Sequence, residues 1–308
     1  MPGYRYAIFG IAAAVILGGG TLVVLGLSND DSSPLGSFQT LGGGATSSKT
    51  TSPKPTGPSP EELAKAARAK QVTQLNAALK KLDTASPEFS VAVLDKKSGQ
   101  TYAYRGTTKY DTASIVKAQI LACMLLHDQD ADHAPTSGEM ALAKPMIRLS
   151  DNNAATSLFQ HVGASSGVTK CNKRLGLSQT AVNSSWGLTR TTANDQIRLL
   201  SELVDPKGPL DTDSRQTAFT LMSSVDNTQD WGIPSIAKSG ETTMVKNGWD
   251  TRSADGGLWA INTIGRVTSG DGDVDVSVAV LSHDNQSMES GVALVQKVAK
   301  LTRQYLKY

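Results

Sequence analysis

The sequence predicts an α+β fold, in which an antiparallel sheet flanked by helices is built from both ends of one domain around an inserted all-helical lobe. Three observations predict it. Strand-like runs (FSVAVLD, TYAYRG) come early, helical periodicity fills a long middle, and three more strand-like runs precede a final amphipathic helix. Strands grouped apart from helices are typical of an α+β arrangement. A cleft between the two lobes is the expected place for a binding site.

The amino-terminal part differs from the rest in composition. Residues 1–5 predict a short cytoplasmic tip, and the uncharged run 6–27 is long enough, at ~1.5 Å per residue, to span a ~30 Å bilayer core. We expect a transmembrane signal anchor there, with a cleaved signal peptide as the alternative. Arg5 before the run and Asp30 after it favour an extracellular carboxyl-terminal domain, either held at the cell membrane by a single pass or secreted.

The stretch 28–58, rich in Ser, Thr, Gly and Pro, predicts a disordered linker, and the folded domain is expected over 59–308. Ser59 and Pro60 begin a helix that should run to about Leu82. Helical periodicity then covers Ala113–His127, Gly138–Leu149, Asn153–Val162, Thr192–Leu203 and Arg215–Ser223. The end of the chain reads as strands TTMVKNGW, LWAINTIGRV and DVDVSVAVLS and the helix Met288–Tyr305.

Composition excludes several function classes. The net charge is +2 without a basic block, so nucleic acid is not an expected partner. The four histidines show no HExxH-type spacing, so we expect no metal site and no cofactor, and a monomer is expected. Cys123 and Cys171 are equally compatible with one disulfide and with two buried thiols.

The first candidate motif is Ser114-x-x-Lys117, in DTASIVKAQIL. Residues three apart share a helix face, so the lysine can act as the base that a serine nucleophile needs. Partial burial and a helix amino terminus both lower a lysine pKa towards that role. One such copy could equally be a solvated helix face, and a second copy lies at Ser235–Lys238.

The second motif is Ser150-Asp151-Asn152, between two predicted helices. Ser150 could pass a proton from Lys117 to a leaving nitrogen, and Asn152 could donate to a substrate amide. Asp151 is expected to point inward and pin the loop. The alternative is an ordinary helix cap, for which these residue types are well suited.

The third motif is Lys246-Asn247-Gly248 on the strand TTMVKNGW. The cation could hold Ser150 and attract a substrate carboxylate, and Gly248 could let a substrate backbone lie against the strand. The Trp249 N–H could complete an oxyanion hole. Alone, this motif could be a strand that ends in a turn.

Together, the three motifs resemble those of the serine β-lactamase and penicillin-binding-protein superfamily, and most closely class A β-lactamases and their exported actinobacterial relatives. The resemblance implies a serine hydrolase in which Ser114, Lys117, Ser150 and Lys246 are catalytic. It implies substrate-binding roles for Asn152, Asn247, Gly248 and Trp249. β-Lactams or acyl-D-Ala-type cell-wall peptides are the implied substrates.

The sequence departs from this superfamily at two places. The third motif is usually Lys-Thr/Ser-Gly, and Lys238-Ser239-Gly240 is a closer literal match. Two strands and a helix should follow the motif, which favours Lys246 and keeps Lys238 as the alternative. The loop that should hold a deacylating glutamate, within 153–194, contains no Asp or Glu. We therefore expect acylation without fast β-lactam hydrolysis.

Rival interpretations remain. Gly163–Gly167 (GASSG) matches the G-x-S-x-G elbow of α/β-hydrolases, although the residues before it predict a helix rather than a strand. A non-catalytic, membrane-tethered domain that binds penicillin or peptidoglycan is the alternative function. Trp186 could line a groove or belong to the core, and Arg190 and Arg252 could meet a substrate carboxylate.

Overall fold

The structure is a computed structural model that describes residues 57–308. The predicted tip (1–5), the anchor (6–27) and nearly all of the linker (28–58) lie outside the described residues. Within 57–308, no helix is both long enough and apolar enough to cross a membrane.

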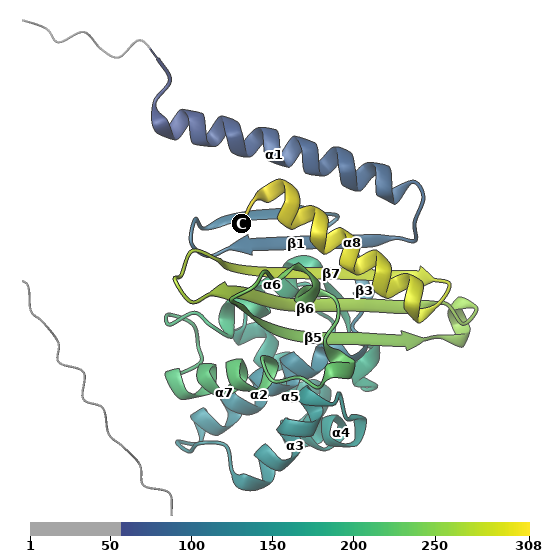
Figure 1. Cartoon of the computed structure of the whole chain (residues 1–308). Coiled ribbons are helices and arrows are strands. Elements are labelled where there is room, and N and C mark those ends of the chain that lie inside the picture. The colour runs from purple at the N-terminus through teal and green to yellow at the C-terminus, as the bar shows by residue number, and fades with distance from the viewer. Residues whose placement is uncertain (1–56) are drawn as a thin grey trace, which may run out of the picture. The chain divides into compact units, whose positions relative to one another are not determined.

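A five-stranded antiparallel sheet forms the centre of the domain (Figure 1). Its strands, in chain order, are β1 (Phe89–Asp95), β2 (Gln100–Tyr104), β5 (Glu241–Thr251), β6 (Trp259–Ser269) and β7 (Asp275–Asn285). Their spatial order is β2-β1-β7-β6-β5, so β1 from the start of the domain pairs with β7 from its end. The predicted α+β fold with a sheet built from both ends is confirmed, and β5 is an edge strand.

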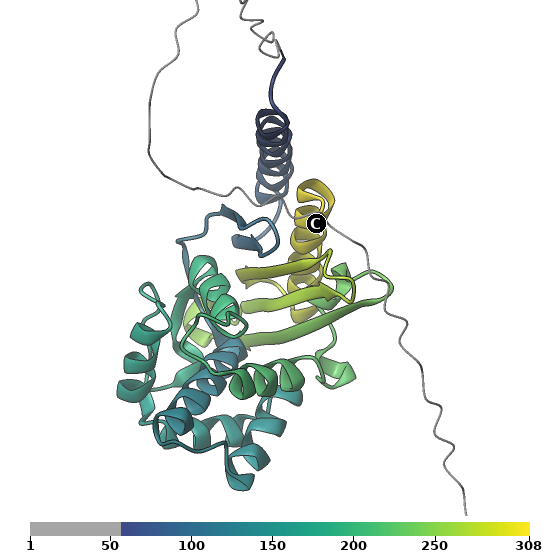
Figure 2. The same ribbon diagram turned by 90° about the vertical axis from the view of Figure 1, so that its left-hand side faces the viewer.

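Helices α1 (Pro60–Asp83) and α8 (Met288–Leu306) cover one face of the sheet (Figure 2). A capping box begins α1, in which Ser59 Oγ accepts from the Glu62 N–H and the Glu62 carboxylate accepts from the Ser59 N–H. Leu75 and Leu79 of α1 are fully buried with strand residues and the inner side of α8. This face is a separate apolar core that holds the two ends of the domain together.

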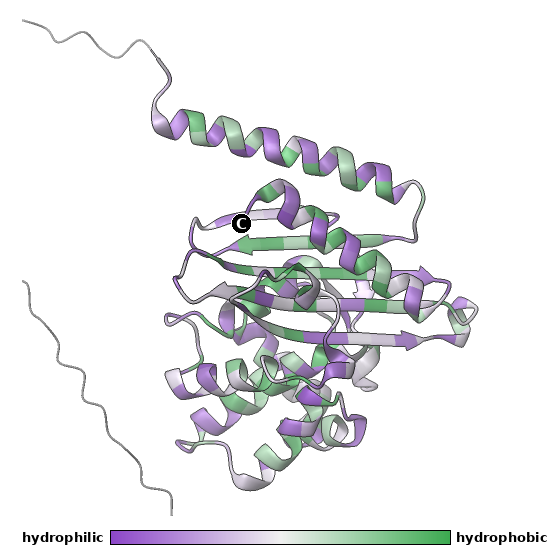
Figure 3. Cartoon of the chain, in the orientation of Figure 1, coloured by the Kyte–Doolittle hydropathy of each residue, from purple (hydrophilic) through white to green (hydrophobic). Residues whose placement is uncertain are grey.

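The helical lobe lies on the other side of the sheet, around α2 (Val116–Asp130). Nearly every residue of α2 is buried, including the polar Lys117, Gln119 and Asp128, because this helix runs through the lobe's centre. Figure 3 shows the apolar residues gathered on α2 and the strands. Around it lie α3 (Ser137–Arg148), α4 (Asn152–His161), α5 (Ala164–Arg174), α6 (Ala193–Glu202) and α7 (Thr212–Met222).

Two elements were not among the predictions. Helix α5 buries few residues and has a largely polar sequence, so its apolar periodicity is weak. A small second sheet pairs β3 (Lys109–Asp111) with β4 (Arg190–Thr192). Each of these strands has three residues, too few to show an alternating pattern. The pair ties the chain entering α2 to the end of the loop that precedes α6.

Cys123 of α2 and Cys171 of α5 form a disulfide, with their Cα atoms 5.7 Å apart. The sequence was equally compatible with a disulfide and with two buried thiols, and the structure shows the disulfide. The bond closes a segment with a sequence separation of 48 residues, which contains α3 and α4. It therefore restrains the unfolded form of most of the helical lobe.

We predict that replacing both cysteines by alanine lowers the free energy of unfolding by about 2–4 kcal/mol, because the unfolded chain regains the entropy of a long closed loop. Urea unfolding of the purified domain measures the change. Reductant should lower the stability of the wild type similarly and leave the double variant unaffected. A loss below about 0.5 kcal/mol, the size of an ordinary surface substitution, would contradict the prediction.

Candidate active site

Ser114 lies in a single 3₁₀ turn, η1 (Ala113–Ile115), that leads into α2. Ala113 has a positive φ of 45°, which is uncommon for a residue with a Cβ. Such a conformation persists where the surroundings enforce it, and it is frequent at functional sites. The turn leaves Ser114 partly exposed between two fully buried neighbours, so its hydroxyl faces a cleft.

Lys117 lies on the first turn of α2, beneath Ser114. Its Nζ is 2.9 Å from Ser114 Oγ, 2.6 Å from the Ser150 carbonyl oxygen, 2.6 Å from Asn152 Oδ1 and 3.1 Å from Ser150 Oγ. The carbonyl and amide oxygens can only accept hydrogen bonds. A neutral amine would donate its two N–H groups to these oxygens. Its lone pair would then be left to accept the proton of Ser114.

The Ser150-Asp151-Asn152 segment both caps a helix and contacts the candidate base Lys117. Asp151 is the N-cap of α4, and its Oδ1 accepts from the Ala154 N–H at 2.7 Å. Ser150 has a positive φ of 60°. The cap therefore holds the loop while Ser150 and Asn152 on either side of Asp151 reach Lys117.

Lys246 on β5 is nearly fully buried, with 1% of its surface exposed. Its Nζ donates to Ser150 Oγ at 3.0 Å and to the Asn247 carbonyl oxygen at 2.8 Å. Lys238 is exposed and precedes the strand, and its backbone N–H donates to Glu241. The structure thus brings Lys246 to the cluster and leaves Lys238 outside it. Two lysine amines converge on the single hydroxyl of Ser150.

Burial lowers the pKa of both lysines. The pKa of Lys117 falls to about 8 because its amine is desolvated, although the nearby Asp151 carboxylate opposes the shift. The pKa of Lys246 lies well below its usual value because of near-complete burial and then because of the charge on Lys117. No described residue forms an ion pair with either lysine. Neutral amine is therefore available near physiological pH.

Asn247 and Gly248 make contacts within the protein that the sequence did not predict. The Asn247 amide is buried and donates to the backbone carbonyls of Gln229 and Trp231, at 2.8 and 2.9 Å. Successive residues of a strand point to opposite faces, so Asn247, next to Lys246, points away from the cleft. The predicted contact between the Asn247 side chain and a substrate is therefore wrong. A Cβ on Gly248 would lie 2.7 Å from the Ser114 backbone nitrogen. The glycine thus accommodates the protein's own serine turn.

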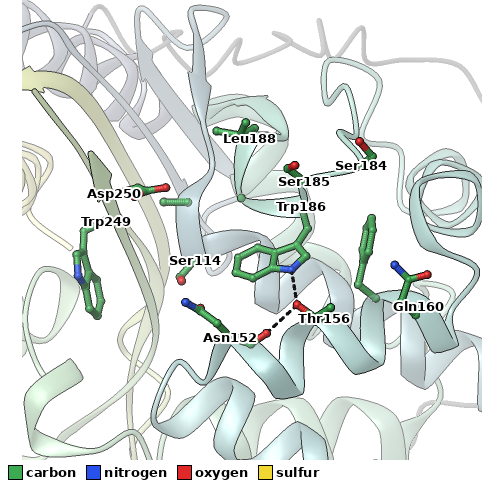
Figure 4. Close-up of a pocket in the computed structure, with 13 residues that line it drawn as sticks. Ser114, Asn152, Thr156, Gln160, Ser184, Ser185, Trp186, Leu188, Trp249 and Asp250 are labelled. Carbon is green, nitrogen blue, oxygen red and sulfur yellow. Dashed lines mark hydrogen bonds between the residues drawn. The ribbon is translucent and has the colours of Figure 1, made fainter. Parts of the chain in front are cut away.

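A pocket of about 450 Å³ opens above Ser114 (Figure 4). Asn152 and Trp186 face Ser114 in this view, while Trp249 lies on the β5 side of the serine. The indole of Trp249 packs near that of Trp231, with ring centroids 5.9 Å apart. The pocket size is in the usual range for small-molecule sites, about 300–1,000 Å³.

Trp186, whose place the sequence left open, lies on a 3₁₀ turn, η2 (Trp186–Leu188), in the loop without carboxylates. Its indole N–H donates to Thr156 Oγ1 at 3.1 Å (Figure 4). Its ring centroid is 4.9 Å from the Lys117 Nζ, within range of a cation–π interaction. The Trp186 ring thus covers the Lys117 amine on the side of the loop that carries Trp186.

Two other predicted features lie outside the pocket. Arg252 pairs with Asp111, and Arg190 Nε lies 3.6 Å from the same carboxylate. Neither arginine lines the Ser114 pocket. The GASSG segment forms the N-cap and first turn of α5 and follows α4, so a helix rather than a strand precedes it and the hydrolase-elbow interpretation is wrong.

A family model described as "Beta-lactamase enzyme family" matches residues 139–306, more than half of the chain. The matched range includes Ser150 and Lys246 and begins after Ser114 and Lys117. Among curated proteins, the chain is 30% identical over 169 residues to "Putative lipoprotein LppW" of Mycobacterium tuberculosis and of Mycobacterium bovis. The alignment covers 52% of this chain, and the chain spans about half (54%) of the length of these relatives.

The fold is similar to those of several class A β-lactamases and related enzymes. It matches a β-lactamase from Xanthomonas campestris pv. campestris with a TM-score of 0.67 and 16% identity, covering 77% of this chain and 98% of that one. The reconstructed last common ancestor of Gram-negative class A β-lactamases gives a TM-score of 0.64 and 21% identity, over 76% and 98%. The chromosome-encoded β-lactamase of Vibrio parahaemolyticus gives 0.64 and 17%, over 76% and 99%.

We predict that Gly248→Ala lowers the free energy of unfolding by about 1–3 kcal/mol, because the new methyl group overlaps the backbone of the serine turn. Thermal and urea unfolding measure the loss. Gly270→Ala is the matched control, since a Cβ there meets nothing within 4 Å, and it should change stability by at most about 1 kcal/mol. Equal effects of the two substitutions would contradict this account of Gly248.

Proposed function

The chain belongs to the β-lactamase enzyme family, and we propose that it acts as an exported serine hydrolase or acyltransferase whose Ser114 is acylated by β-lactams or acyl-D-Ala-type cell-wall peptides. The observation that carries the proposal is the position of the Lys117 amine, 2.9 Å from Ser114 Oγ, with two pure acceptors for its own N–H groups. A serine that must only bind a ligand has no need of a desolvated base.

In the proposed acylation, Lys117 takes the hydroxyl proton while Ser114 Oγ attacks the substrate carbonyl carbon. The backbone N–H groups of Ser114 and Trp249 stabilise the oxyanion that forms. Ser150, held between the two lysine amines, passes a proton to the leaving nitrogen, and the C–N bond breaks. Lys246 adds positive charge beside the substrate carboxylate, and Asn152 binds the substrate amide.

Hydrolysis of the acyl-enzyme is proposed to be slow. Residues 153–194, which include the loop over the pocket, contain no Asp or Glu to activate a water molecule, and the ring of Trp186 lies against the Lys117 amine. General-base assistance is worth about 10²–10⁴ in rate, so its loss leaves a long-lived adduct. Transfer to an amine or slow release would then complete the cycle.

We also propose where this chemistry takes place. The uncharged run 6–27 would anchor the chain, the stretch 28–58 would act as a tether, and the domain 59–308 would work outside the cell as a monomer. The mycobacterial relatives named as lipoproteins support a membrane-associated location. Cell-wall peptides are the polymers within reach of such a domain.

We predict that a fluorescent penicillin labels the purified chain covalently and that Ser114→Ala abolishes the label. Gel fluorescence and intact mass would show one adduct per chain, and a chase with unlabelled drug would show its persistence. Ser165→Ala, in the rejected GASSG segment, is the matched control and should label as the wild type does.

Each outcome of this experiment has a definite meaning. Label that clears with a turnover well above ~10 s⁻¹ would contradict the slow hydrolysis. Label retained in Ser114→Ala would reject Ser114 as the nucleophile. A folded wild-type chain without any adduct would favour the non-catalytic penicillin- or peptidoglycan-binding domain.

We predict that the acylation rate rises about tenfold per pH unit below an apparent pKa of about 8 and levels off above it. The sign follows from the proton on Lys117: protonated amine has no lone pair for the serine proton, and raising the pH removes it. Rates of adduct formation between about pH 6 and 10 measure the profile. Lys117→Arg should lose ~10²–10⁴ in rate at every pH, since guanidinium stays protonated. A flat wild-type profile would exclude Lys117 as the base.

A further inference from the structure

Histidine and carboxylate side chains gather in the helical lobe, where the carboxyl ends of α2 and α4 meet. His127 and Asp128 lie in the last turn of α2, and His161 is the last residue of α4. One possible ligand atom of each residue lies within 4.8 Å of those of the other two. The two imidazole rings meet edge-on, with centroids 5.2 Å apart. The proposed acylation uses none of these side chains.

Asp128 gives independent evidence that this cluster binds something. Its side chain is fully buried, and neither carboxylate oxygen accepts a hydrogen bond from any described residue. The nearest basic atom is His127 Nδ1, 3.5 Å from Oδ1. A buried, ionised carboxylate is costly unless a cation or strong donors compensate it. The Glu139 carboxyl group also lies against Asp128, so two carboxyl groups and two imidazoles face one another with no cationic Lys or Arg side chain paired to them among the described residues.

Glu139 of α3 supports His161 from the other side. One carboxylate oxygen of Glu139 accepts from the Thr136 N–H and hydroxyl, at 2.6 and 2.7 Å, so the side chain is fixed. The other oxygen lies 2.8 Å from His161 Nε2. A carboxylate on the imidazole is the usual partner of a metal-binding histidine, because it orients the ring and strengthens the ligand.

We propose that His127, Asp128 and His161 bind a divalent transition-metal ion of the Zn²⁺ class, with Glu139 orienting His161. Two imidazoles and one carboxylate are a donor set typical of zinc, and three protein ligands leave a position for water. The side chains of His127 and His161 are 50% and 40% exposed, so an ion can enter from solvent. Bonds of about 2.0–2.2 Å to one ion require the three ligand atoms, which lie within 4.8 Å of one another, to close around it.

The ion would act on the same two helices that carry the candidate active site. Lys117 on the first turn of α2 and Asn152 at the start of α4 are joined by a 2.6 Å hydrogen bond. The metal ligands lie at the opposite ends of these helices, about 15 Å away at 1.5 Å per residue. An ion would therefore tie α2 and α4 at their far ends, as the lysine joins them at the near ends. The sequence could not show this, because the ligands come from different helices without a linear motif.

Zinc titration of the full chain, stripped of metal with a chelator, tests the proposal. We expect one Zn²⁺ per chain and a higher midpoint of thermal unfolding when the ion is bound. The double variant His127→Ala/His161→Ala should lose the bound ion and the thermal shift. Glu139→Gln, which can keep the capping box, should weaken binding about 10- to 100-fold. Co²⁺ bound in place of Zn²⁺ should give a visible absorption band that the double variant lacks.

Two variants serve as matched controls. His283 also lies beside carboxylates, Glu88 and Asp284, but outside the cluster, so His283→Ala should bind Zn²⁺ as the wild type does. Ser114→Ala should do the same, which separates this proposal from the proposed acylation. Equal binding by the wild type and the double variant would overturn the site, as would a wild-type chain that binds no zinc. If the double variant does not fold without metal, the test rests on two other results. These are the zinc affinity of Glu139→Gln and the absorption band of the wild type with Co²⁺, and the absence of both effects would overturn the site.

Discussion

The burial of two lysine amines around one serine hydroxyl is the constraint on which the site depends. Lys117 and Lys246 approach Ser150 Oγ at 3.1 and 3.0 Å, and neither has a carboxylate partner among the described residues. Desolvation lowers the pKa of both lysines, and the charge on Lys117 lowers that of Lys246 further, so neutral amine becomes available. Burying these amines costs stability, but it gives Lys117 the neutral form that the proposed base requires. The rest of the domain supplies the packing that holds it.

The sheet and the helical lobe hold this cluster from opposite sides. The edge strand β5 carries Lys246 towards the lobe, while Asn247 on the opposite side of the strand fixes the loop that contains Gln229 and Trp231. Gly248 then lets the backbone of the serine turn approach the strand closely. The disulfide between α2 and α5 and the burial of α2 hold in place the helix that carries Lys117. Three consecutive residues of β5 therefore have three different roles.

The loop over the pocket, which carries Trp186, presents different chemical groups from the cluster of Lys117, Ser150 and Lys246 beneath it. Below the loop, the amine of Lys117 and the hydroxyl of Ser150 are the groups near Ser114 that could transfer a proton. Above, the loop contributes the indole of Trp186 and no acidic side chain. If Ser114 is acylated as proposed, the lack of a carboxylate on this loop would favour formation of the acyl-enzyme over its hydrolysis. The same helices, α2 and α4, extend from this pocket to the histidine and carboxylate cluster at their other ends, so the lobe joins two chemically distinct centres.

The sequence by itself determined the α+β class, the order of the main strands and helices apart from α5, β3 and β4, and the grouping of Lys117, Ser150, Asn152 and Lys246 with Ser114. Apolar periodicity and motif order are local, and counting strands after the third motif was enough to choose Lys246 over Lys238. Tertiary structure alone decided the disulfide, the roles of Asn247 and Gly248, the place of Trp186 over Lys117, and the meeting of His127 with His161. Each of these depends on which face a side chain takes and on how closely distant segments approach. Neither quantity is encoded in residue spacing along one element.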